Sequence, residues 1–168
     1  NAIYINPDGG SCPQCLSPLS LAEANAMPPV TVPSGVTCGG DLVVNDANTP
    51  LIGPSANTFT IGSGVKCFNS ITVMANKKLR KADDQPVYLL SYLNARQNTE
   101  IGHPEAAQHT RMKIYIVGGA GVSSILGQNN LTTTRTTFYG ALYAPLDHVW
   151  LINTTVFGSI ASNMVYVD

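Results

Sequence analysis

A chain of 168 residues with 44% apolar side chains is long enough for one domain with a buried core. Only 11% of the residues are charged, and Asn, Thr, Ser and Gly take the place of the missing charges. The net charge is -1, and all 9 basic residues lie between positions 66 and 135, so the middle of the chain is basic. This composition favours a β-rich extracellular protein and argues against a helical cytosolic enzyme.

Residues 1–40 are predicted to form a loop-rich cap that prolines interrupt repeatedly. One short helix is expected over residues 20–27, because Ser20 and Glu23 form a capping box and Pro28 and Pro29 follow. The sequence has no run of eighteen apolar residues and no signal peptide. We therefore expect an exported protein whose N-terminal stem is not part of this sequence, with no membrane contact by the residues present.

The four cysteines predict two disulfide bonds. Only Cys12 and Cys15 are close in sequence, whereas a zinc site needs two close pairs and a thioredoxin-like site needs a helix start. We expect Cys38 and Cys67 to pair with Cys12 and Cys15 in either order. Disulfide bonds would place the protein outside the cytosol.

From residue 41 onward, apolar residues alternate with polar ones in short segments that Gly, Pro or Asn separates. Triplets with an apolar residue at both ends and Thr, Tyr or Trp in the centre recur along this part of the chain, for example at residues 71–73, 114–116, 149–151 and 165–167. Such regularly spaced short strands are typical of two all-β architectures, a β-solenoid with stacked coils and a β-sandwich.

The last third of the chain resembles a known family. The motifs are Ile114-Tyr115-Ile116, a Gly-rich turn at 118–121, Phe138-Tyr139-Gly140-Ala141-Leu142-Tyr143-Ala144-Pro145, then Val156-Phe157-Gly158-Ser159-Ile160 and a last strand that ends in Asp168. This series resembles the C-terminal β-solenoid-like domain of bacterial type IV pilus assembly proteins and large minor pilins. It matches residues 112–168 well and residues 41–93 loosely. The resemblance implies a right-handed β-solenoid over residues 41–168 and contact with other pilin subunits through the missing stem.

The two similar stretches that start at Phe138 and Val156 are predicted to be successive coils. A glycine after an aromatic residue allows the backbones of two coils to approach closely. Two sets of residues are expected to face the interior: the aliphatic residues Leu142, Ile160 and Val165, and the small residues Ala141, Ala144, Ser159 and Ala161.

The residues 76–81 contain the strongest candidate for a binding site. Four basic residues, Lys77, Lys78, Arg80 and Lys81, occupy five positions. This run fits either a solvated loop tip or a contact with an anionic polymer such as DNA or a surface polysaccharide. Residues that could extend the contact are Arg96, Arg111 and Lys113.

No set of residues in the sequence predicts catalysis, a metal site or a cofactor. His103 and His109 lie in a long polar segment at 94–112, but their spacing matches no recognised ligand pattern. Asp83 and Asp84 are adjacent, so on a strand they would face opposite sides and could not act as a pair. We expect a non-enzymatic minor pilin or pilus-associated protein with a structural and adhesive role, located outside the cell, on its surface or on a pilus, and in the periplasm before assembly. The alternative is a secreted β-helix enzyme that acts on polysaccharide, or a carbohydrate-binding module.

Overall fold

The computed structural model describes residues 27–118, 123–127 and 135–168. Cys12, Cys15 and all but the last residue of the helix expected at 20–27 lie outside these ranges. Within the described ranges the regular secondary structure is β-strand apart from one 3-10 helix, η1. No helix of the described residues is long and apolar enough to cross a membrane. The strands and helix are β1 (Leu42–Val44), β2 (Thr58–Ile61), β3 (Lys66–Phe68), β4 (Ile71–Val73), β5 (Lys78–Lys81), β6 (Val87–Leu89), β7 (Leu93–Ala95), β8 (Glu100–Ile101), η1 (Ala106–Arg111), β9 (Lys113–Ile116), β10 (Ser123–Leu126), β11 (Thr136–Leu151) and β12 (Thr154–Val167).

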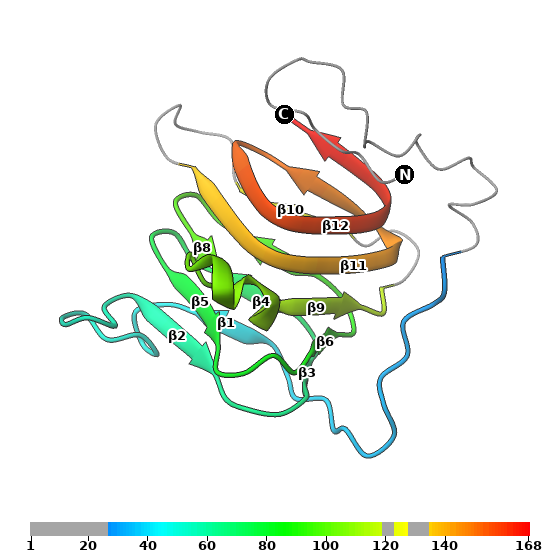
Figure 1. Ribbon diagram of the computed structural model, residues 1–168, viewed down its shortest axis with the longest axis horizontal. Helices are drawn as coiled ribbons and strands as arrows, with labels where there is room; N and C mark the ends of the chain where they lie inside the picture. The colour runs from blue at the N-terminus through cyan, green and yellow to red at the C-terminus, as the bar shows by residue number, and fades with distance from the viewer. Residues whose placement is uncertain (1–26, 119–122, 128–134) are drawn as a thin grey trace.

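The strands form a β-solenoid with three walls, as Figure 1 shows. Wall A contains β1, β4, β7 and β10, wall B contains β2, β5 and β8, and wall C contains β3, β6 and β9. The long strand β11 pairs with β8, then β9, then β10, so it passes through all three walls, and β12 follows it. Every strand pairing among the described residues is parallel, which confirms the solenoid and excludes the β-sandwich.

The core follows from the alternation of side chains along each strand. In wall A, Val44, Val73, Ala95, Leu126 and Leu151 form one inward column. One turn of the solenoid takes 29 residues from Val44 to Val73 but only 16 from Leu151 to Val167, because β12 passes through the walls as one continuous strand. The same alternation places Leu142 and Ala144 inside.

The expectation for three of the small residues is wrong. Ala141, Ser159 and Ala161 lie on the outward side of their strands, because each is adjacent to the inward Leu142 or Ile160. Residues next to one another on a strand face opposite sides, so small size did not decide their orientation.

Two glycines allow the coils to approach each other as expected. A Cβ atom at Gly140 would lie 2.2 Å from the carbonyl oxygen of Met112, and one at Gly158 would lie 1.8 Å from that of Gly140. Both residues have φ near +145°, which other residues rarely adopt. The repeated aromatic-glycine motif therefore marks the place where three successive coils cross closely.

The described part of the predicted cap, residues 27–40, runs along wall C and is called the strap below (Figure 1). The predicted cysteine pairing is wrong, since Cys38 of the strap forms a disulfide bond with Cys67 of β3. Cys67 lies in the outward column of wall C, in register with Tyr88, and the strap passes directly over that column. The bond closes a loop with a sequence separation of 29, which stabilises a folded chain by about 3.5 kcal/mol in the chain-entropy model.

Candidate binding surfaces

Three tyrosines form a ladder on the outer side of wall C. Tyr88 of β6 and Tyr143 of β11 both align with Tyr115 of β9. The ring centroids of Tyr88 and Tyr115 are 5.5 Å apart with nearly parallel planes, and those of Tyr115 and Tyr143 are 6.1 Å apart with an edge-to-face arrangement. Each tyrosine stands between two buried aliphatic residues, so strand alternation turns every ring outward. We call these residues the tyrosine ladder.

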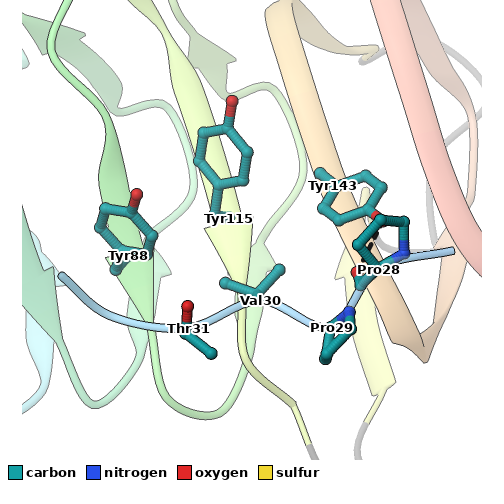
Figure 2. Close-up of a pocket in the computed structure, with 7 residues that line it drawn as sticks. All are labelled: Pro28, Pro29, Val30, Thr31, Tyr88, Tyr115 and Tyr143. Atoms are coloured by element: carbon teal, nitrogen blue, oxygen red, sulfur yellow. Dashed lines mark hydrogen bonds between the residues drawn. The ribbon is translucent and has the colours of Figure 1, made fainter.

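The strap crosses the tyrosine ladder and leaves a groove between them (Figure 2). The groove has a volume of about 330 Å³ and is lined by the three tyrosines and by strap residues 28–31. At one end, the hydroxyl group of Tyr143 donates a hydrogen bond of 2.7 Å to the carbonyl oxygen of Pro28. At the other end, the Cys38–Cys67 bond holds the strap to the wall. The strap is therefore attached at both ends of the groove, which we call the strap groove.

The strap bends between its two attachments. The amide of Val36 donates to the carbonyl oxygen of Pro33 at 3.2 Å, and Gly35 has φ +83°, as a type II turn requires. Val30 is the one described residue of the strap that is buried. The turn thus separates residues 28–31, which cover the tyrosine ladder, from the part of the strap that contains Cys38.

The strap groove is apolar and uncharged. None of its seven lining residues has a charged side chain, and its polar groups are the tyrosine hydroxyls, the hydroxyl of Thr31 and the backbone of the strap. Burial raises the pKa of Tyr143 above its ordinary value, so its hydroxyl stays protonated and continues to donate to Pro28. This lining suits an uncharged ligand with both apolar and hydroxyl groups.

A second aromatic surface lies on wall A and is not covered by the strap. Trp150 of β11 stacks on Tyr166 of β12 with ring centroids 4.2 Å apart and planes 14° apart. Trp150 is 39% exposed and Tyr166 is 36% exposed, and the adjacent Met164 is also exposed. The ring of His148 meets Tyr166 edge-on at 6.1 Å. We call Trp150, Tyr166, Met164 and His148 the wall A patch.

A third group of aromatic rings consists of residues that pack on one another. The ring centroids of His109 on η1 and Tyr139 on β11 are 5.0 Å apart, and the ring of Tyr139 also stacks on that of Phe157 on β12. The polar segment at 94–112 contains the end of β7, the whole of β8 and the helix η1, which packs on β11. His103 bonds to the backbone oxygen of Lys81 instead of approaching His109.

The basic run at residues 76–81 is mostly engaged in internal ion pairs. Lys81 is fully buried and donates to Asp83 and to the carbonyl oxygen of Gly62. Lys77 is 5% exposed and donates to Asp46 at 2.5 Å and to Asn57 at 2.8 Å. The two buried ammonium groups are paired with these acceptors and are not available to a ligand in this conformation.

The remaining cationic candidates lie on separate elements. Arg80 of β5 pairs with Glu100 of β8, and Lys78 of β5 is exposed. Arg96 is exposed after β7, whereas Arg111 of η1 and Lys113 of β9 are half-buried. Lys78 and Arg96 are thus the most accessible of the seven residues expected to bind a polymer.

Two acids have unusual environments. The pKa of Asp83 is lowered to about 2, mainly by the hydrogen bond from Lys81 and by the backbone amide of Gly64. Burial raises the pKa of Asp147 on β11 to about 6. Its Oδ2 atom accepts a hydrogen bond of 3.3 Å from Ser124, whereas its buried Oδ1 atom has no partner among the described residues. Asp147 lies on β11 and Asp83 in the loop between β5 and β6, and the described residues contain no group of three His, Cys, Asp or Glu side chains that could hold a metal ion.

The sequence motifs contained a signal for the ladder, since each tyrosine is the centre of an apolar triplet, but not for the strap that covers it. Pro28 and Tyr143 are 115 positions apart, and no local pattern connects them. Comparisons with protein-family models, with curated proteins and with solved structures found no match to this chain.

Proposed function

We propose that this protein is a non-enzymatic extracellular domain of the large minor pilin type, which attaches to an uncharged surface polysaccharide through the wall A patch. The observation that carries the proposal is the exposed stack of Trp150 on Tyr166 beside Met164. The proposed assembly with other pilin subunits is supported by the resemblance of the β11 and β12 motifs to those of large minor pilins.

Exposed aromatic side chains that lie together favour an interaction site. Monomeric proteins rarely leave contiguous apolar patches open to water, and Trp, Tyr and Met are enriched where proteins bind partners. Here the two rings stack on each other in the free protein, so little side-chain freedom is lost when a ligand binds. A rigid, uncharged aromatic surface suits the apolar faces of sugar rings.

The ion pairs within the basic run make DNA a weaker candidate ligand than a neutral polymer. A phosphate backbone is bound mainly by Lys and Arg side chains that give up counterions. Lys77, Arg80 and Lys81 already pair with acidic side chains. DNA binding would therefore depend on Lys78 and Arg96, with Arg111 and Lys113 adding partial contacts.

The Cys38–Cys67 bond and the low content of charged residues support a location outside the cytosol. The protein would be displayed at the cell surface or on a pilus after passage through the periplasm. Detection of the protein in the fraction of appendages sheared from intact cells tests this part. Its recovery with the cytosolic fraction would contradict it.

Binding to immobilised cellulose, chitin and a single-stranded oligonucleotide tests the polymer class. We expect wild type to bind a polysaccharide with little salt dependence, and Trp150→Ala to weaken that binding about tenfold or more. Phe157→Ala is the matched control, since Phe157 is also an exposed ring stacked on a neighbour but lies outside the patch. If Trp150→Ala binds like wild type, or if only the oligonucleotide binds and Lys78→Ser abolishes this, the proposal is wrong.

A further inference from the structure

The strap groove is an open apolar groove whose lining resembles that of a ligand site, and it is separate from the wall A patch. Its volume of about 330 Å³ falls within the range of ligand pockets in proteins. A strap that served only to tie residues 28–40 to wall C would pack against the tyrosines without leaving this space, because apolar contacts stabilise a fold only when the surfaces touch. Here the Tyr143–Pro28 hydrogen bond and the Cys38–Cys67 bond hold the strap at both ends, and the groove remains between them.

The chemistry of the lining selects among ligand classes. The absence of charged lining residues disfavours phosphates, nucleotides and other ions, whose charge would remain uncompensated. The three aromatic rings and two prolines offer apolar surfaces, which favour a ligand with an apolar face. Among the tyrosine hydroxyls, only that of Tyr143 makes a hydrogen bond to a described residue, so those of Tyr88 and Tyr115 are available to a ligand.

We propose that the strap groove binds one end or one short segment of an uncharged saccharide. A sugar ring has an apolar C–H face that packs on the rings of Tyr88 and Tyr115, and its hydroxyl groups bond to the tyrosine hydroxyls and to Thr31. Val30 and Thr31 of the strap lie beside Tyr115 and Tyr88, and Pro28 and Pro29 lie at the Tyr143 end. Since proline lacks a backbone N–H, the strap wall offers carbonyl acceptors that bond to sugar hydroxyls. Figure 2 shows the rings and the strap on the two sides of this site.

The site is independent of the polysaccharide attachment proposed for wall A. The tyrosine ladder belongs to wall C and the patch to wall A, and no residue is shared. Substitutions in one surface are therefore expected to leave the other unchanged.

Titration of the oxidised full chain with glucose, galactose, N-acetylglucosamine and the β1,4-linked disaccharides cellobiose and chitobiose tests the proposal, with calorimetry and saturation transfer from the tyrosine rings as readouts. We expect at least one saccharide to bind saturably and independently of salt. Tyr115→Ala should weaken binding about tenfold, and Tyr115→Phe, which removes only the hydroxyl, about threefold. The titrations are carried out in the Trp150→Ala background, which removes the wall A patch, and Phe157→Ala, an exposed ring outside both surfaces, should leave this binding unchanged.

Several outcomes would overturn the proposal. One is that none of the five saccharides binds to wild type. Another is that Tyr115→Phe and a folded Tyr115→Ala both bind like wild type. A third is that only a peptide with the sequence of residues 28–33 binds, in which case the groove recognises proline-rich segments such as the strap itself. Melting curves of each variant separate loss of binding from loss of fold.

Discussion

β11 and β12 take the same path through the three walls, pair at successive positions along nearly their whole length and share the aromatic-glycine motif, yet their side chains differ in burial. Leu142 of β11 is 2% exposed, whereas Ile160, its partner in β12, is only partly buried. Leu151 is 6% exposed and its partner Val167 is 54% exposed. Within the described part of the chain, β11 has a strand on each side and β12 has a strand on one side only. Burial of a coil therefore depends on the next coil as much as on its own sequence pattern.

The largest expected effect of this difference concerns the two glycines. Gly140→Ala should destabilise the fold by about 4 kcal/mol, because its Cβ atom would collide with the Met112 carbonyl oxygen while β12 prevents β11 from moving away. Gly158→Ala meets a similar collision with Gly140, but no described strand holds β12 from the other side, so about 2 kcal/mol is expected. Urea unfolding measures both values. Equal losses would show that β12 is as confined as β11.

The paired aliphatic residues give the next effect. Leu142→Ala should cost about 3 kcal/mol, because it opens a cavity among fully buried neighbours. Ile160→Ala should cost about 1 kcal/mol, since part of its side chain is already in contact with water. Thermal and urea unfolding of the two variants under the same conditions provide the comparison. A loss of 3 kcal/mol for Ile160→Ala would mean that the exposed end of the solenoid is covered in solution.

Much of the solenoid could be predicted from the sequence, because each coil repeats a local rule. The apolar triplets identify strands, and the glycines of β11 and β12 identify close crossings. The run at 77–81 also follows this local rule. Lys78 and Arg80 alternate with Leu79 and Lys81, so strand periodicity alone indicates that Lys81 faces inward with Leu79. The four positive charges in five positions obscure this signal, because a basic run is typical of an exposed segment.

The cysteine pairing and the strap groove could not be predicted in the same way. Both depend on the path of residues 27–40 across wall C, and the contacts join segments far apart in the chain, such as Pro28 and Tyr143. A proline-rich stretch without periodicity predicts a loop but not the surface on which that loop lies. The wall A patch is an intermediate case, because Trp150 and Tyr166 were recognisable as triplet centres but their exposure was not.

Asp147 marks the one place where β11 and β12 lose their register. The shift falls between Ala144 and His148, where β11 has two more residues than β12, and it leaves the carboxyl group of Asp147 buried. Since its folded pKa is raised from 3.8 to about 6, the folded state holds this proton more tightly than the unfolded state. The free energy of unfolding should therefore fall as the pH rises from about 4 to about 6, and remain lowered above that range.

Asp147→Asn tests this assignment because it removes the charge and keeps the shape. At pH 7 the variant should be more stable than wild type by on the order of 1–2 kcal/mol, since a buried carboxylate with an unpaired oxygen is replaced by a neutral amide. At pH 4 the two proteins should differ little. Asp84→Asn, at an exposed position, is the control for general charge effects. A variant that is less stable than wild type at pH 7 would show that the carboxylate has a favourable partner.

The smallest expected effect concerns the ring pairs that continue from β11 onto β12. Trp150 stacks on Tyr166 at 4.2 Å and Tyr139 stacks on Phe157 at 5.0 Å, and in both pairs the β12 ring is exposed. A double-mutant cycle with alanine should give a coupling energy of about 1 kcal/mol for the closer pair, as is typical of aromatic contacts. The second pair should give a similar or smaller value, although His109 also contacts it. If the Trp150–Tyr166 coupling is zero, the two rings move independently, and the wall A patch would lose the rigidity on which its proposed role in binding depends.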